Sequence, residues 1–248
     1  MLLLKAASVG VLGLAFAGLV WPAAPASPSP ADTRLDLVDR YMDAVRNQQG
    51  RLHGASMEVE IDAKLPSLRK WGKLSALRHI SQIGKISYLM RSFVGDDTVK
   101  KDVIARYLQA EIQAQNSNSQ VAITPANYKF RYKGQQKRDD RWVHLFQLTP
   151  QKKRVGLFKG ELWVDADTYL PVRESGRLVK NPSVFLKRVD FVRAYTIEDG
   201  VAYPKSIDSI VDTRLVGRAE LHIHFTNYSH TEAGDAADDD ASDGASRD

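Results

Sequence analysis

The sequence has no cysteine among its 248 residues. This absence excludes disulfide bonds, thiolate chemistry and the cysteine at which bacterial lipoproteins are lipidated. Stability must therefore come from an ordinary hydrophobic core. Hydrophobic residues make up 43% of the chain, which is typical of globular proteins.

The chain also lacks a hydrophobic run near its N-terminus that is long enough for a membrane span. The apolar run from Ala6 to Val20 follows Lys5 and has 15 residues, whereas a spanning helix needs about 20. Ala24-Pro25-Ala26 offers the small-residue pattern of a signal-peptidase site. These features predict a cleaved signal peptide over residues 1–26 and an exported mature chain.

Known catalytic motifs are absent, including nucleotide-binding glycine loops and the His-Glu-x-x-His zinc motif. Glu174-Ser175-Gly176 resembles part of a nucleophile elbow, but it lacks the preceding glycine and lies in a strand pattern. His222 and His224 have the spacing of a metal pair, but the strand alternation places them on the solvent face without an evident third ligand. We therefore predict no catalytic residue, no metal and no cofactor. The alternative is an enzyme whose curved sheet encloses a polar cavity with buried carboxylates or histidines.

The formal net charge of +5 is the sum of a basic main part of the chain and an acidic C-terminus. Residues 231–248 hold seven acids and one arginine, which predicts a disordered tail. Residues 27–230 then carry a net charge of +10; we interpret 27–32 as a linker and 33–230 as one folded domain. The basic residues either coat the solvent face or attract an anionic membrane surface or an acidic partner. Nucleic acid is not an expected partner of an exported chain.

Two amphipathic helices are predicted. Apolar residues recur at helical spacing between Thr33 and Asn47, and Thr33 is in the position of a helix cap. Asp96 is predicted to cap a second helix, whose apolar positions begin at Val99. Residues 66–84 mix basic residues with apolar ones at threefold spacing, and we predict a short helix or an irregular segment there.

Most of the remaining chain alternates apolar and polar residues, as half-buried strands do. At least nine strands are predicted, over residues 56–65, 85–95, 128–134, 141–150, 155–165, 170–179, 183–197, 201–213 and 216–229. Gly156 and Gly160 share a strand face with Phe158 and allow strong curvature or the close approach of a ligand. The sequence thus predicts a mainly β fold with helices (α+β), in which a strongly curved antiparallel sheet forms an incomplete β-barrel with the helices as plug or lid.

One part of this layout resembles a known family. A strand ends at Asp165, the chain reverses through Leu170-Pro171 into Val-Arg-Glu-Ser-Gly at 172–176, and a hairpin with Asp199-Gly200 follows. This pattern is similar to the periplasmic lipoprotein-carrier (LolA/LolB-like) superfamily, which includes RseB-like proteins. The resemblance implies an incomplete barrel, a helical lid, a periplasmic location, and an apolar cavity for lipoprotein acyl chains or related lipids without covalent chemistry. The family's lid-locking arginine has no single match here, so no functional residue is transferred.

The strand alternation predicts which side chains line the interior. The inward set, which we predict to contact a hydrophobic ligand, is Phe130, Phe158, Leu162, Val164, Phe191, Leu221, Ile223 and Phe225. The leading functional hypothesis is a non-catalytic periplasmic carrier for a lipoprotein acyl chain or another lipid, with a membrane receptor as partner. The alternative is an envelope sensor that docks on a regulator protein or a secreted complex.

Overall fold

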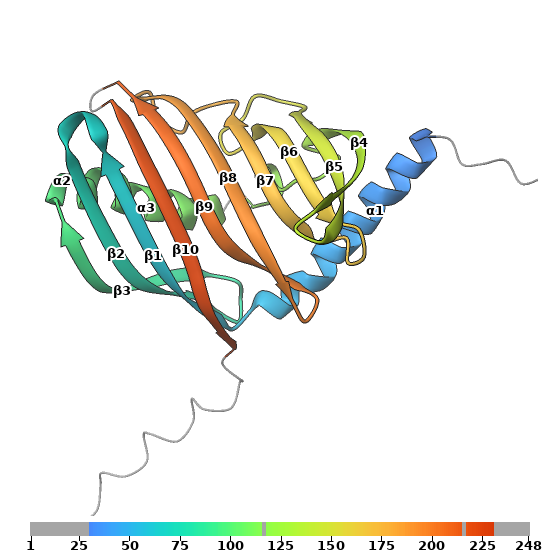
Figure 1. The fold of residues 1–248 in the computed structure, drawn as a ribbon, viewed down its shortest axis with the longest axis horizontal. Coiled ribbons are helices and arrows are strands. Elements are labelled where there is room, and N and C mark those ends of the chain that lie inside the picture. The colour runs from blue at the N-terminus through green and yellow to red at the C-terminus, as the bar shows by residue number, and fades with distance from the viewer. Residues whose placement is uncertain (1–29, 116–117, 215–216, 231–248) are drawn as a thin grey trace, which may run out of the picture.

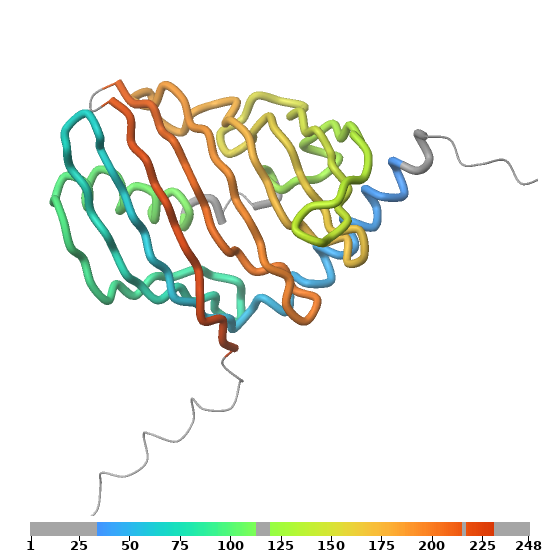
Figure 2. The backbone as a smooth tube through the Cα atoms, viewed as in Figure 1, coloured from blue at the N-terminus to red at the C-terminus, as the bar shows by residue number. Residues whose placement is uncertain are grey.

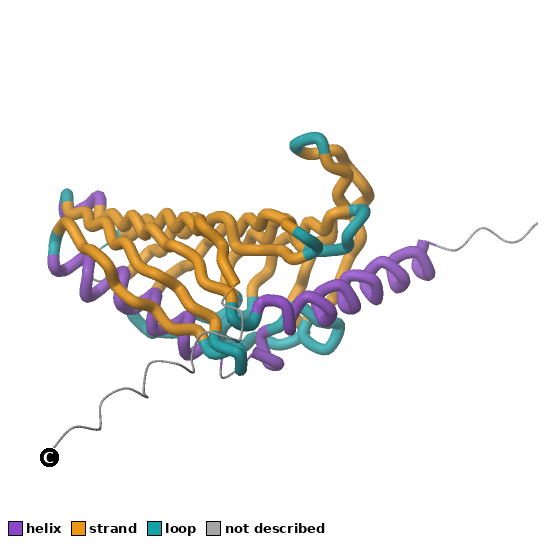
Figure 3. The backbone as a smooth tube through the Cα atoms, turned by 90° about the horizontal axis from the view of Figure 1, so that it is seen from below, coloured by secondary structure: helices purple, strands orange, loops and turns teal. Residues whose placement is uncertain are grey.

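The computed structural model describes residues 30–115, 118–214 and 217–230. Within these residues, ten antiparallel strands form one sheet that curves around two helical segments (Figure 1). Seen along the sheet, the helices lie on its concave side, and the sheet stays open (Figure 3). The predicted fold class is therefore confirmed. The predicted signal peptide over 1–26 and the acidic tail over 231–248 lie outside the described residues.

The strands lie in the order β3-β2-β1-β10-β9-β8-β7-β6-β5-β4. Their bounds are β1 (Ala55–Leu65), β2 (Lys70–Ile80), β3 (Ile86–Gly95), β4 (Tyr128–Arg138), β5 (Arg141–Pro150), β6 (Phe158–Asp165), β7 (Pro171–Leu178), β8 (Leu186–Glu198), β9 (Val201–Thr213) and β10 (Arg218–His230). Neighbours in the sheet are also neighbours in the chain, except that β1 pairs with β10. The tube in Figure 2 follows this path, with the first and last strands side by side.

Helices cover the concave face at both ends of the sheet. The helical elements are α1 (Pro30–Gln49), α2 (Asp97–Val99), a π-helical turn (Lys100–Ile104), α3 (Ala105–Gln115) and α4 (Asn118–Val121). The cap at Asp96 is confirmed, because its carboxylate accepts a hydrogen bond from the Thr98 amide at 2.8 Å. Helix α1 begins at Pro30, inside the segment predicted as a linker, because proline favours the first turn of a helix.

The prediction of a helix or irregular segment over residues 66–84 is wrong. A short 3₁₀ turn (Pro66–Leu68) precedes strand β2, which pairs with β1 and β3. The threefold spacing that suggests a helix comes partly from Leu68 and Trp71, which are exposed. The true alternation is hidden because the inward positions of β2 include a glycine, an alanine and the charged Arg78.

Buried apolar side chains of the described residues form two clusters rather than one. The α1 cluster consists of Leu37, Val38, Tyr41, Tyr128, Phe146, Leu148, Leu157, Phe158, Leu162 and Val164. The α2–α3 cluster consists of Ala55, Met57, Val59, Ile61, Ala63, Leu65, Leu74, Ala76, Ile80, Val99, Val103, Ile104, Ile207, Ala219, Leu221, Ile223 and Phe225. The sheet thus offers two apolar areas, each covered by its own helical segment.

A pair of glycines brings β6 and β7 unusually close together. Gly160 lies opposite Gly176, and a Cβ atom on Gly160 would lie 1.9 Å from the Ser175 carbonyl oxygen. The predicted close approach at Gly160 therefore exists, but the approaching group is the neighbouring strand. Gly156 has a left-handed φ of +87° and lies before β6 begins.

Candidate functional site

The eight residues predicted to face inward lie on the concave face, but they do not form one site. Phe158, Leu162 and Val164 belong to the α1 cluster, and Phe130 and Phe191 pack against it. The remaining three are members of the α2–α3 cluster, namely Leu221, Ile223 and Phe225. The division follows the strands, since β4 to β6 lie under α1 while β10 lies under α2 and α3. Contact of these residues with a ligand stays a prediction.

Buried polar side chains lie between the two apolar clusters. Glu174 on β7 is 6% exposed and faces β8. Its carboxylate accepts hydrogen bonds from Arg193 Nη1 at 3.0 Å and from the Tyr195 hydroxyl at 2.8 Å. Tyr195 and then Glu174 raise the pKa of Arg193 against the opposing effect of burial. The guanidinium is therefore held in its charged form, with a buried carboxylate on one side and partial exposure of the Arg193 side chain (40%) on the other.

A second buried ion pair joins strand β2 to helix α3. Arg78 is 7% exposed, and its Nη2 atom lies 3.1 Å from Glu111 Oε1. Arg78 Nε also donates to the Tyr88 hydroxyl at 3.2 Å, and that hydroxyl donates to the other oxygen of Glu111. Burial lowers the pKa of Arg78, but the charges of Glu111 and Tyr88 outweigh it and raise that pKa overall.

Tyr107 on α3 connects these two ion pairs electrostatically. Burial raises the pKa of its hydroxyl, the charge of Glu111 raises it further, and Arg193 and Arg78 oppose the rise. We call this set the inner polar network. It consists of Arg78, Tyr88, Tyr107, Glu111, Glu174, Arg193 and Tyr195.

Sequence reasoning missed the inner polar network, although one signal was available. Arg193 and Tyr195 share the alternation of Phe191, which is predicted to face inward. A charged residue on a face otherwise assigned to the core indicates a buried partner. The partner itself could not be deduced, because Glu174 and Glu111 lie on other elements.

The buried carboxylates bear on the alternative of an enzyme. Glu111 and Glu174 are each paired with an arginine, so neither is a free general base. His144 binds the Tyr132 hydroxyl at 3.1 Å, and burial lowers its pKa. Asp165 accepts hydrogen bonds from the backbone and side chain of Thr168 and stabilises the reversal after β6. These contacts hold the ionisable side chains in one charge state and one position, which favours a binding role over acid–base chemistry.

The sheet splits between β9 and β10 at one end. Their pairing stops at His224 and Ser206, and a groove of about 440 Å³ opens beside the split. The groove is lined by Thr196, Glu198, Lys205, Phe225, Thr226, Asn227 and Tyr228. The Tyr228 hydroxyl donates to the Pro204 carbonyl at 2.5 Å and so replaces a missing strand contact. Of the predicted ligand-contacting residues, Phe225 is the one in this lining.

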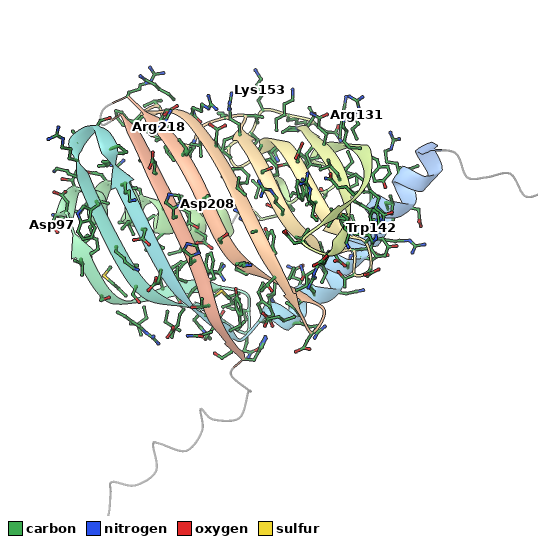
Figure 4. The ribbon with its side chains drawn as sticks, viewed as in Figure 1. Asp97, Arg131, Trp142, Lys153, Asp208 and Arg218 are labelled. Atoms are coloured by element: carbon green, nitrogen blue, oxygen red, sulfur yellow. The ribbon has the colours of Figure 1, made fainter. Side chains whose placement is uncertain are left out.

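Charges of both signs lie on the outer face of the sheet, where Lys73 pairs with Glu60 and Arg177 pairs with Asp190. Asp208 lies in the middle of this face, where Nδ1 of the exposed His222 is 2.8 Å from its carboxylate, and Arg131 lies toward the β4 end (Figure 4). Across β6 and β7 at that end, Lys159 lies opposite Arg177. Within the described part of the chain, no three His, Asp or Glu side chains are arranged to hold a metal ion. Among the same residues, no helix is long and apolar enough to cross a membrane.

Comparisons with known proteins give likenesses of structure. No family model and no curated protein matches the sequence. A domain named for outer membrane lipoprotein sorting, from Vibrio parahaemolyticus, is similar with 10% identity and a TM-score of 0.43, over 82% of this chain and 94% of that chain. A LolA superfamily protein from Nitrosomonas europaea has 12% identity and a TM-score of 0.36, over 80% and 94%. The MucA/MucB complex of Pseudomonas aeruginosa has 13% identity and a TM-score of 0.28, over 79% and 100%.

Proposed function

We propose that this chain is a non-catalytic periplasmic binding protein that holds the acyl chain of a lipoprotein or another lipid on the concave face of its sheet. The observation that carries the proposal is the cover of this face, which consists of helices packed on two separate apolar clusters. A helix makes its backbone hydrogen bonds internally, so it can leave a sheet without exposing unpaired backbone groups. A ligand chain would replace the side chains that such a helix contributes.

Helix α3 contacts the sheet through partly buried apolar side chains and through the Arg78–Glu111 ion pair. The helical segment is anchored at its start by the Asp96 cap and by Val99 and Ile104, which are almost fully buried. Further along, Leu108 packs against the cluster while half-buried, and Ile112 is 41% exposed. The π-helical turn, which carries the buried Val103 and Ile104, leads directly into α3, and such turns are frequent at functional sites. Movement of α3 would uncover the apolar side chains of β2 and β3.

The energy of acyl burial favours such a replacement. Each buried methylene contributes about 0.8 kcal/mol, so a chain of 12 carbons offers about 9 kcal/mol before the cost of opening. Helix α3 would give up the packing of Tyr107 and Leu108, which are both only partly buried. The departing helix would also break the ion pair of Glu111 with Arg78, so acyl burial would have to offset both losses.

Native mass spectrometry of the mature chain, residues 27–248, tests the proposal together with extraction of bound lipid. We expect bound acylated molecules, or uptake of added dodecanoate, in the wild-type protein. Ile80→Gln should weaken uptake, because Ile80 is 8% exposed within the α2–α3 cluster. Ile83→Gln is the matched control, since Ile83 is 84% exposed. A wild-type protein that carries and takes up no acyl compound would refute the proposal.

A second candidate function is that of a sensor that docks on a regulator protein. It is favoured by β3, which forms one open edge of the sheet and exposes Leu89 (66%) and Val94 (62%) beside Trp71 on β2. An edge strand with apolar neighbours can accept an extended segment of another protein by strand addition. Cross-linking from the edge in periplasmic extract, with and without Leu89→Lys, would identify such a partner. A wild-type protein that captures nothing specifically would exclude this candidate.

A further inference from the structure

We infer that the ligand is an anionic amphiphile, whose charged head group takes the place of the Glu111 carboxylate on Arg78. This inference rests on the proposed function, because it names the class of molecule that the concave face would hold. The head group is a carboxylate or a phosphate monoester, which share the ability to bind a guanidinium group through two oxygens.

The contacts around Arg78 come from two different parts of the fold. Its neighbours from the sheet are the Tyr88 hydroxyl at 3.2 Å and the Met57 sulfur at 3.6 Å, and both are uncharged groups. Its carboxylate partner, Glu111, comes from helix α3. When α3 moves away, the sheet therefore keeps the arginine and loses its counter-charge.

The ion pair of Glu174 with Arg193 differs in the origin of its partners. Glu174 and Arg193 both lie on strands, and so does Tyr195, which donates to Glu174. This pair stays intact whether or not α3 is present. The surface uncovered by α3 thus holds two guanidinium groups and one carboxylate, a net charge of +1 from Arg78, Arg193 and Glu174.

The position of this charge determines which ligands can bind. Arg78 lies on the same strand face as Leu74, Ala76 and Ile80, which belong to the α2–α3 cluster. An uncharged ligand on these residues would leave a guanidinium group unpaired in apolar surroundings, which is strongly unfavourable. A ligand with one anionic group restores the pair while its chain covers the apolar side chains. The inner polar network therefore selects for an acyl chain with a negative head group.

Three ligands with the same chain length test the inference. We would titrate the mature chain at pH 8 with dodecanoate, dodecyl phosphate and dodecanol, and measure affinity by calorimetry below the micelle concentrations. We expect at least one anion to bind about tenfold or more tightly than dodecanol, as a gained charge-assisted pair requires. Preference for dodecanoate points to a carboxylate ligand, and preference for the phosphate points to a phospholipid-like ligand.

Two variants locate the effect at Arg78. Arg78→Gln should remove the preference for anions. Glu111→Gln should raise the affinity for the anions several-fold and should also raise that for dodecanol, because displacement of α3 then breaks no ion pair. Arg91→Gln is the matched control, since Arg91 pairs with Glu58 on the outer face. If Arg78→Gln does not fold, the anion affinity of Glu111→Gln alone tests the inference.

The outcomes separate this inference from the proposed function. Equal affinity of the wild type for all three ligands would overturn the inference and leave acyl binding intact. Unchanged anion affinity in Glu111→Gln would also overturn it. If none of the three ligands binds, both the inference and the proposed function fail.

Discussion

Removal of the Glu174 side chain should cost this protein a large part of its folding stability. Glu174→Ala leaves the Arg193 guanidinium without its carboxylate and also removes the acceptor of the Tyr195 hydroxyl. The Glu174 side chain is 8% exposed and that of Arg193 is 40% exposed, so water can reach part of the guanidinium once its partner is lost. We therefore expect a loss of about 1.5–3 kcal/mol, the range for hydrogen bonds to charged groups.

Urea unfolding followed by circular dichroism gives the free energy of unfolding by linear extrapolation. Asp43→Ala is the control, because the Asp43–Arg46 pair is exposed by 65% and 69% and should contribute less than about 0.5 kcal/mol. Glu111→Ala should cost at least as much as Glu174→Ala, since it leaves Arg78, whose side chain is 9% exposed, without its carboxylate. A Glu174→Ala loss within about 1 kcal/mol of the control would refute the reasoning, because it would mean that the inner polar network is hydrated.

Three further changes have expected outcomes. Gly160→Ala should lower stability by about 1–3 kcal/mol in urea unfolding, because a new methyl group would overlap the neighbouring strand, whereas Gly50→Ala has open space and should be neutral. Asp96→Ala removes a helix cap and should cost about 1 kcal/mol, with faster amide exchange in the helix that follows. Burial lowers the pKa of His144, so stability present above about pH 6.5 should decline as the pH falls and the unfolded chain is protonated first. Melting temperatures at pH 7.5 and 5.5 check this, and His144→Gln should reduce the difference between them.

The period-two alternation was sufficient to predict most of the sheet. It failed at β2, because the inward positions of that strand hold Gly72 and Arg78 in place of large apolar residues. The alternation of apolar and polar residues indicates on which face of the sheet a side chain lies, but it does not indicate which helix covers that face. For this reason the inward position of Phe158 and Ile223 could be predicted, but their separation into two clusters could not.

The candidate site was less predictable than the fold for a related reason. Arg78 and Glu111 are 33 residues apart, and their meeting depends on where α3 crosses the sheet. Charged residues at inward strand positions are visible in a sequence, but their partners depend on tertiary packing. The buried ion pairs thus required the structure, whereas the apolar residues around them did not.

The pairing of β1 with β10 has a consequence for the order of folding. Ala55 lies opposite His230. Strand β1 can pair with β2 early, but its pairing with β10 requires the last strand of the sheet. Such distant pairings raise the contact order, and proteins of high contact order fold slowly. The α2–α3 cluster draws members from both strands and is complete only when the whole folded region has been synthesised. During synthesis, this part of the core can therefore form only after strand β10 has left the ribosome.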